Sequence, residues 1–266
     1  MKKSKTNKEK KYNLAECYAH RGFHDKENAP ENSMAAFRRA VEHGMSSEID
    51  VHRIADGSLV VFHDDELKRM TGAPGRIADY DIESLSKLRL AGTDEMIPSF
   101  DDVLELYENT GLHLLIELKV DKRNHKELAA AVADRLVRYE GDFAVQSFDP
   151  RAVREFRKHM PGIALGLLTK NYFNKDDGAI KTWIAKVSNL FFNRMAAADF
   201  ASFKFKDKKN RLLHMAIKRR GMGRLTWTLR TPKAYKAAVS AGYIPIFEGF
   251  DPGEIKEDGD KEKDEK

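Results

Sequence analysis

The chain has 266 residues, of which 41% are hydrophobic and 33% are charged, and its formal net charge is +5. This length and apolar content exclude a wholly disordered chain and fit one domain of roughly 200 to 250 residues. The single cysteine, Cys17, excludes an internal disulfide and a zinc site built from cysteines.

Short apolar runs alternate along the chain with longer segments of helical periodicity. In chain order, we expect strands at Cys17–His20, Ser46–Val51, His113–Leu118, Phe143–Phe148, Ile163–Leu168, Phe200–Phe205, Leu225–Leu229 and Ile244–Phe247. We expect helices at Ser33–His43, Phe100–Asn109, His125–Tyr139, Asp149–His159, Asp177–Met195, Asn210–Arg219 and Thr231–Ala241. This alternation predicts an α/β protein, and eight strands in this length favour a closed (β/α)8 TIM-type barrel over an open sheet.

One segment interrupts the alternation after the second strand. Asp56-Gly57 predicts a turn that leads back into a hairpin strand over Ser58–Phe62. Residues 65–98 then form a small insertion with several glycines and prolines. Because the loops that follow the strands build the active site of such a barrel, we expect the insertion to lie beside that site.

The charge is uneven, and it predicts a disordered tail at each end of a single domain over residues 12–252. Residues 1–11 carry six lysines and one glutamate, and residues 253–266 carry four lysines against seven acids. The domain between them has no strongly basic stripe, which argues against nucleic-acid binding. The basic arm at residues 1–11 could touch an anionic membrane surface weakly, but no apolar face accompanies it.

Nothing in the sequence predicts a transmembrane helix, because no apolar stretch reaches the roughly 18 residues that one needs. The N-terminal lysines are followed by the short segment Tyr12–Glu16, which is not the apolar core of a signal peptide. We therefore expect a cytoplasmic protein.

Acidic residues repeat at matching places in two strands. Side chains alternate along a strand, so Glu48 and Asp50 share one face, and Glu117 shares a face with Lys119 in the next barrel strand. In a barrel, the opposite, apolar faces pack on the helices, which leaves these charges pointing inward. Neighbouring carboxylates repel unless a cation lies between them, and their oxygens suit Mg²⁺ or Ca²⁺. The alternative is a set of solvent-exposed acids and one exposed Glu–Lys pair.

Two histidines stand at the ends of strands on the expected loop-rich face. His20 ends the first strand, and His63 follows the hairpin strand. A pair of histidines suits acid–base catalysis near neutral pH, although a lone histidine is more often structural. Arg21 and Lys119 would add positive charge for an anionic group such as phosphate. These residues alone predict a metal-assisted enzyme that acts on an anion, without identifying its substrate.

A set of short motifs keeps its order and spacing from about Tyr18 to Asp251. In chain order they are His20-Arg21-Gly22, Pro30-Glu31-Asn32-Ser33, Glu48-Ile49-Asp50-Val51, Asp56-Gly57, Val60-Val61-Phe62-His63-Asp64, Ile97-Pro98-Ser99-Phe100, Ile116-Glu117-Leu118-Lys119, Gln146-Ser147-Phe148 and Trp227-Thr228. No single piece is specific. Together they resemble the glycerophosphodiester phosphodiesterase family.

The resemblance implies a TIM-type barrel enzyme that hydrolyses small glycerophosphodiesters to glycerol 3-phosphate and an alcohol. In that family, the glycerol 2-hydroxyl attacks phosphorus and water then opens the resulting cyclic phosphate. The resemblance also implies one divalent cation, Mg²⁺ or Ca²⁺, held by the residues that match the family's ligands, Glu48, Asp50 and Glu117.

The resemblance assigns further roles to residues around that cation. It implies His20 and His63 as the acid–base pair, without saying which is the acid. Arg21 and Lys119 match positions that hold the substrate phosphate. Trp227 could form an apolar wall for the glycerol or the head group, or it could simply be a packing residue.

Three places depart from the family pattern and leave the choice of substrate open. Ile54 stands where threonine is usual, Arg230 stands where asparagine is common, and Ile246–Pro252 replaces a closing strand with its Thr-Asp. One alternative is a phospholipase D-type barrel that acts on lysophospholipids or sphingomyelin. Another is a catalytically silent barrel that serves as a binding module. Chelator-sensitive release of glycerol 3-phosphate would distinguish these functions.

Overall fold

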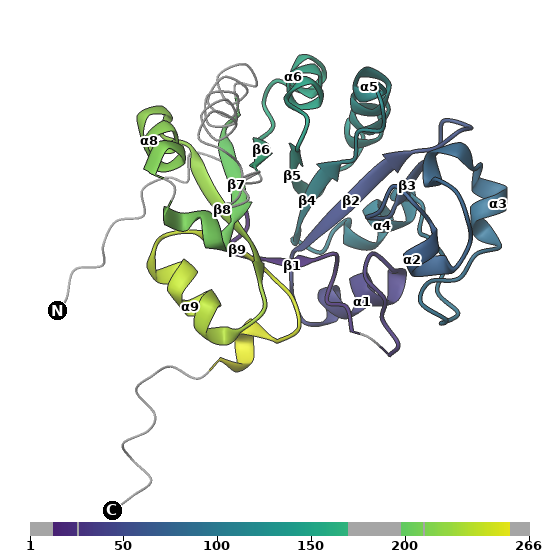
Figure 1. Cartoon of the computed structure of the whole chain (residues 1–266), viewed down its shortest axis with the longest axis horizontal. Helices are drawn as coiled ribbons and strands as arrows, with labels where there is room; N and C mark the ends of the chain where they lie inside the picture. Colours follow the sequence, from purple (N-terminus) through teal and green to yellow (C-terminus); the bar gives the residue numbers. More distant parts are fainter. Residues whose placement is uncertain (1–12, 26, 170–197, 210, 256–266) are drawn as a thin grey trace, which may run out of the picture.

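The structure, a computed structural model, describes residues 13–25, 27–169, 198–209 and 211–255. Among these residues, eight parallel strands close into a barrel, because β1 pairs with both β2 and β9. The strands are β1 (Tyr18–His20), β2 (Ser47–Arg53), β4 (His113–Leu118), β5 (Asp142–Ser147), β6 (Leu165–Thr169), β7 (Phe200–Lys204), β8 (Gly223–Leu229) and β9 (Ile244–Phe247). The predicted (β/α)8 TIM-type barrel is confirmed (Figure 1).

Helices follow the strands and cover the outside of the barrel. They are α1 (Met34–Glu42), α4 (Phe100–Tyr107), α5 (His125–Leu136), α6 (Pro150–His159), α8 (Arg211–Arg220) and α9 (Pro232–Ser240). Two of these helices begin at a capping residue, because the side chains of Asp149 and Thr231 accept hydrogen bonds from backbone N–H groups of α6 and α9. The strand bounds differ from the predicted ones by at most two residues at either end. The predicted helix Asp177–Met195 lies outside the described residues.

The two faces of the barrel strands have different partners. Outward side chains such as Val51, Ile116 and Val145 pack with Phe100 and Phe156 of the covering helices. Inward side chains fill the lower part of the barrel with a second apolar cluster, which contains Tyr18, Leu115, Phe200, Leu225 and Ile246. This plug closes the barrel below its mouth, so that the polar inward side chains lie together above it.

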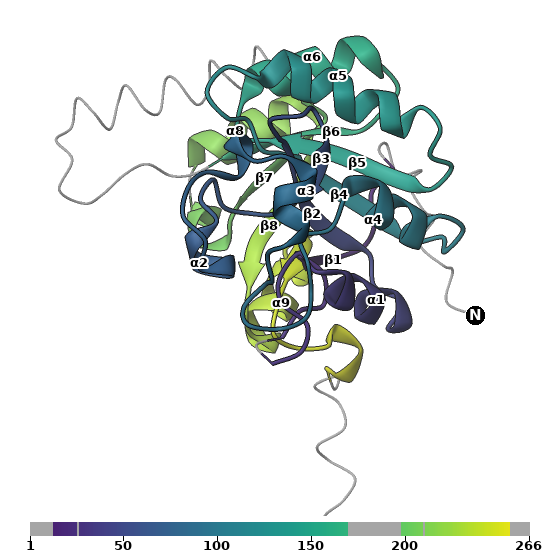
Figure 2. The ribbon, with the colours of Figure 1, turned by 90° about the vertical axis from the view of Figure 1, so that its right-hand side faces the viewer.

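The segment after β2 is more ordered than its glycines and prolines predict. Strand β3 (Leu59–Val61) pairs antiparallel with β2 and confirms the hairpin. The insertion then forms α2 (Lys68–Thr71), the 3-10 turn η1 (Ile77–Asp79) and α3 (Ile82–Ser86), which share a small core of their own. Figures 1 and 2 both show α2 and α3 on one side of the barrel, next to β2 and β3. The sequence predicted the insertion but neither these helices nor their core.

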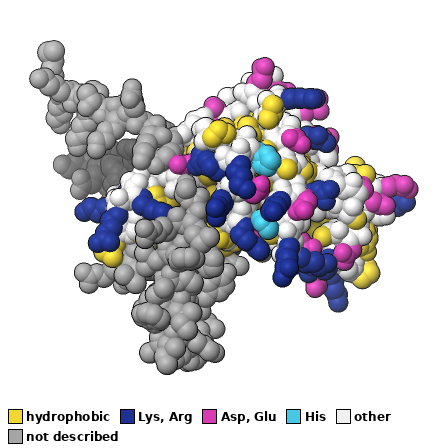
Figure 3. All heavy atoms as spheres, turned by 90° about the horizontal axis from the view of Figure 1, so that it is seen from above, with side chains coloured by type: hydrophobic (Ala, Val, Ile, Leu, Met, Phe, Trp, Pro, Cys, Tyr) yellow, Lys and Arg dark blue, Asp and Glu magenta, His cyan; other side chains and the backbone are white. Residues whose placement is uncertain are grey.

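The remaining described segments add two short turns. They are η2 (Phe205–Lys209), directly after β7, and η3 (Pro252–Glu254) near the end of the described chain. Residues 1–12 and 256–266, which contain most of both predicted tails, lie outside the described residues. No helix in the described part is long and apolar enough to cross a membrane. The face in Figure 3 shows basic and acidic side chains interspersed with scattered hydrophobic ones.

Gly166 of β6 offers a test of the packing inside the barrel. A Cβ atom added there would lie 2.0 Å from the ring of Phe200, which is fully buried in the apolar plug. We expect Gly166→Ala to lower the free energy of unfolding by about 1–3 kcal/mol, because the ring must move. Gly162→Ala is the matched control, since nothing lies within 4 Å of a Cβ added there. Equal urea midpoints for the two variants would contradict this packing.

Candidate active site

The polar inward side chains surround a cavity of about 420 Å³ at the mouth of the barrel. All the site residues that the sequence predicts line this one cavity: His20, Arg21, Glu48, Asp50, His63, Glu117, Lys119 and Trp227. They come from β1, β2, β4 and β8 and from the segments that directly follow the strands. The fold therefore brings together residues that are up to 207 positions apart in the sequence (227 − 20).

Strand register places the three acids against one another. Asp50 of β2 is paired in register with Glu117 of β4, and Glu48 lies two residues earlier on the same face of β2. One ligand oxygen from each carboxylate lies within 4.8 Å of the others, and all three side chains are buried. The acids thus converge inside the barrel, and the alternative of separate exposed acids is wrong.

Two cationic side chains contact this acidic group. Lys119 Nζ lies 3.0 Å from Glu117 Oε1 and 3.4 Å from Asp50 Oδ1. Arg21 Nε lies 3.4 Å from Asp50 Oδ2, and the backbone N–H of Arg21 donates a hydrogen bond of 3.2 Å to Glu48. With all five groups ionised, three negative charges face two positive ones, so the group keeps one net negative charge in a buried place.

The loop after β1 holds this arrangement through an unusual backbone. Arg21 and Asn32 have φ angles of 57° and 56°, in the left-handed region that non-glycine residues rarely adopt. Asn32 Nδ2 donates a hydrogen bond of 3.0 Å to Asp50 Oδ2. Gly22 has a φ of 81°, and a Cβ there would lie only 2.9 Å from the Cβ of Ala36 in α1. Glycine at this position lets the loop approach the helix.

Burial and the neighbouring charges shift the pKa values of the three acids in different directions. Burial raises the pKa of Glu48 well above its usual value, and the charges of Asp50 and Glu117 raise it further. Burial also raises the pKa of Glu117. For Asp50, burial acts in the same direction but is outweighed by Lys119, His63 and Arg21, so its pKa is lowered. Glu48 is therefore the acid that most needs an additional cation to ionise.

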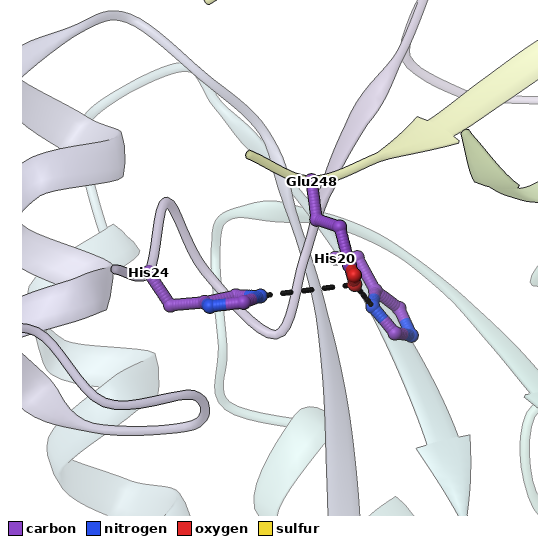
Figure 4. A group of neighbouring side chains, drawn as sticks. All are labelled: His20, His24 and Glu248. Atoms are coloured by element: carbon purple, nitrogen blue, oxygen red, sulfur yellow. Dashed lines mark hydrogen bonds and ion pairs between the residues drawn. The ribbon is translucent and has the colours of Figure 1, made fainter. Parts of the chain in front are cut away.

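His20 makes a short contact with a carboxylate that the sequence did not single out as a site residue. Its Nδ1 lies 2.6 Å from Oε2 of Glu248, the first residue after β9. Arg230 Nε donates to the other oxygen at 2.5 Å, and His24 Nε2 lies 3.8 Å from Oε2 (Figure 4). Burial opposes the ionisation of Glu248, but its contacts with His20, His24 and Arg230 outweigh burial and lower its pKa.

His63 also contacts a carboxylate through Nδ1. Its Nδ1 lies 2.6 Å from Asp64 Oδ1, and Arg69 Nε donates to Asp64 Oδ2 at 2.5 Å. A carboxylate can only accept, so Nδ1 of each of the two histidines carries the hydrogen, and Nε2 of a neutral ring is left with its lone pair. Burial lowers the pKa of both histidines, which favours the neutral ring.

Two groups of side chains in the described residues could hold a metal ion. One is the acidic triad of Glu48, Asp50 and Glu117, and the other consists of His20, His24 and Glu248. In the second group, the guanidinium of Arg230 already contacts the carboxylate. Its positive charge disfavours a cation there, whereas the triad has a net negative charge to balance. The triad is the better candidate.

Glu248 was not predicted as a site residue, because its segment stood out only as a departure from the family pattern. Position supplies the signal that could have found it, since in a closed barrel the last strand lies beside the first, which carries His20. The position of Trp227 is compatible with either expected role. It packs against the apolar plug and also lines the cavity.

Comparison with known proteins identifies the family to which the chain is similar. The sequence profile of the glycerophosphoryl diester phosphodiesterase family matches residues 20–249. The chain is 33% identical over 183 residues to the glycerophosphodiester phosphodiesterase of Bacillus altitudinis, which covers 65% of this chain and 74% of that protein. It is 29% identical over 244 residues to the glycerophosphodiester phosphodiesterase of Caldanaerobacter subterraneus subsp. tengcongensis, which covers 86% of this chain and 91% of the relative.

The fold also matches solved structures. A phosphodiesterase of Oleispira antarctica, solved in complex with the product sn-glycerol-3-phosphate, aligns with a TM-score of 0.75 and 24% identity. The alignment covers 91% of this chain and 95% of that one. This likeness supports the barrel fold.

The raised pKa of Glu48 predicts that metal binding releases protons. A cation among the carboxylates favours their ionised form and lowers that pKa, so protons are released at any pH between the metal-free and metal-bound values. We expect the release on adding Mg²⁺ or Ca²⁺ to the metal-free protein to decrease as the pH rises through the raised pKa of Glu48, because the acid is then already ionised. Calorimetric titration in buffers of different ionisation enthalpy measures it.

Two variants test whether the released protons come from Glu48. Glu48→Gln should remove most of the proton release, whereas Glu105→Gln, on the exposed face of α4, should leave it unchanged. Proton uptake, or the absence of any proton exchange across this pH range, would show that the triad is not the site where the cation binds.

Proposed function

The chain belongs to the glycerophosphoryl diester phosphodiesterase family, and we propose that the cavity at the mouth of its barrel is the active site. There, a divalent cation, two histidines and two basic residues would hydrolyse a glycerophosphodiester to glycerol 3-phosphate and an alcohol. The observation that carries the proposal is the convergence of three buried carboxylates, two cationic side chains and two carboxylate-bound histidines on one cavity.

The acidic triad fits a hard divalent cation such as Mg²⁺ or Ca²⁺. Its oxygens lie close together, and Asp50 Oδ1 is buried without a hydrogen-bond partner among the described residues. One added dication would turn the net charge of the triad with Lys119 and Arg21 from −1 to +1, which suits an anionic diester. When bound, a cation there supplies Lewis-acid stabilisation of charge on the phosphoryl oxygens.

Arg21 and Lys119 would position the phosphate. Lys119 is largely buried between Glu117 and Asp50, which raises its pKa despite the opposing effect of burial, so it stays charged. Arg21 is anchored by Glu31 through a hydrogen bond of 2.7 Å. Fixed charges in a partly dry cavity stabilise developing negative charge more strongly than mobile ones in water.

The two histidines would transfer the protons. One accepts at Nε2 the proton of the attacking glycerol 2-hydroxyl, and the other, in its protonated form, donates from Nε2 to the departing alcohol oxygen. Glu248 and Asp64 keep the opposite nitrogen of each ring protonated and would stabilise the imidazolium when it forms. We therefore infer that Glu248 is a positioning residue for His20.

Release of glycerol 3-phosphate tests the function directly. We expect the purified chain to convert glycerophosphoglycerol into equal amounts of glycerol 3-phosphate and glycerol, to lose this activity with a chelator, and to regain it with Mg²⁺ or Ca²⁺. Asp50→Ala should abolish turnover. Asp134→Ala, which changes an exposed residue of α5, should not. Full turnover in the presence of the chelator would exclude the metal role, and a cyclic phosphate as the only product would indicate phospholipase D-type chemistry.

The contact of Glu248 with His20 predicts a coupled effect on kcat. We expect His20→Ala to lower kcat about 10²- to 10⁴-fold and Glu248→Ala to lower it less, with little change in KM. If Glu248 acts through His20, the double variant should be no slower than His20→Ala alone. Glu254→Ala, exposed in η3, is the control. Additive losses in the double variant would show that Glu248 acts independently of His20.

A further inference from the structure

We propose that the half of the cavity opposite the acidic triad binds the alcohol part of the substrate, and that Lys204 selects anionic or hydroxyl-rich head groups over quaternary ammonium groups. This inference rests on the proposed function and names the class of substrate that the same site prefers. It depends on three residues, Phe148, Lys204 and Trp227, which we call the head-group wall.

The head-group wall is formed by neighbouring strands. Lys204, the last residue of β7, is paired in register with Trp227 of β8, and its Nζ lies 5.3 Å from the centroid of the Trp227 ring. Phe148 directly follows β5, and its ring stands perpendicular to that of Trp227 at a centroid distance of 5.9 Å. All three side chains line the cavity.

The two halves of the cavity differ in charge. The residues from β1, β2, β4 and the segment after β3 contain all the acids that line it, together with Arg21 and Lys119. Of the described lining residues from β5 onward, only Lys204 is charged. Within the described part of the chain, no acid forms an ion pair with Lys204, whose ammonium group instead lies over the Trp227 ring. Gln146, which is buried at the base of this half, has an Oε1 without a hydrogen-bond partner in the described structure.

The geometry of the reaction assigns the alcohol part to this half. In an in-line displacement, the attacking and leaving oxygens lie on opposite sides of phosphorus. The glycerol that attacks through its own 2-hydroxyl must stay folded against the phosphorus, near the triad and the histidine that accepts its proton, while the other histidine reaches the departing oxygen. The alcohol therefore extends away from that side, and the head-group wall is the surface of the cavity that lies opposite.

The chemistry of the wall then determines which alcohol it favours. A bare tryptophan face attracts a quaternary ammonium group through cation–π interaction. Here Lys204 already occupies that interaction, so a second cation is repelled and an anionic group is attracted. A head-group hydroxyl could also donate to Gln146 Oε1. Removal of one unit charge about 10 Å from a singly charged head group changes the affinity for that head group by about tenfold or more at an effective dielectric constant of about 20.

The test compares kcat/KM for three glycerophosphodiesters with different head groups: cationic choline, neutral glycerol and anionic glycerol phosphate. The wild-type protein should prefer the anionic head group to glycerol, and glycerol to choline. Lys204→Met should lower the ratio of anionic to choline substrate at least about tenfold, and Lys204→Glu should lower it further. Lys204→Gln, which keeps a polar side chain, should match Lys204→Met.

Lys208→Met is the matched control. Lys208 also stacks on an aromatic ring, with its Nζ 4.1 Å from the centroid of Phe205, but it is exposed and does not line the cavity. It should leave the ratio unchanged. An unchanged ratio in the Lys204 variants, or an equal loss on all three substrates, would overturn the inference, because Lys204 would then bind the phosphate or nothing. Failure of the wild-type protein to hydrolyse any of the three would instead contradict the proposed function.

Discussion

The arrangement of the barrel mouth depends on the mutual repulsion of Glu48, Asp50 and Glu117, which lie close together and are almost fully buried. Such a group is unfavourable unless positive charge surrounds it, and Lys119 and Arg21 supply two of the three charges needed. The left-handed turn at Arg21 places both its side chain and its backbone N–H against the acids. Ionisation of all three acids, and of Glu48 above all, needs one further cation, which is the physical reason to expect a metal ion.

Beside the acidic triad, the same set of hydrogen bonds, from a histidine to a carboxylate to an arginine, occurs twice. Nδ1 of His20 is hydrogen-bonded to Glu248, and Arg230 donates to the other oxygen of that carboxylate. Nδ1 of His63 is hydrogen-bonded to Asp64, and Arg69 donates to the other oxygen there. The arginines help to keep the carboxylates ionised, so the histidines stay oriented with Nε2 available. The pair at Glu248 joins the first and last strands, and the pair at Asp64 belongs to the segment that leads into the insertion.

Local patterns in the sequence were enough to predict the barrel and the convergence of the acids. The alternation in β4, whose bounds His113–Leu118 were predicted without error, places Glu117 inward. Contacts across the closed barrel could not be predicted in this way. Glu248 reaches His20 over 228 residues, and Lys204 meets Trp227 only because β7 and β8 pair in one register. The small core of the insertion was missed because its glycines and prolines conceal scattered apolar residues.

The most direct test of the central claim is the position of the bound cation. A crystal of the protein grown with Mn²⁺, measured at the manganese absorption edge, would locate it by anomalous scattering. The charge balance at the barrel mouth predicts one strong peak bonded to oxygens of Glu48, Asp50 and Glu117. No peak at these carboxylates, or a peak between His20, His24 and Glu248 instead, would contradict the proposal that the acidic triad is the metal centre.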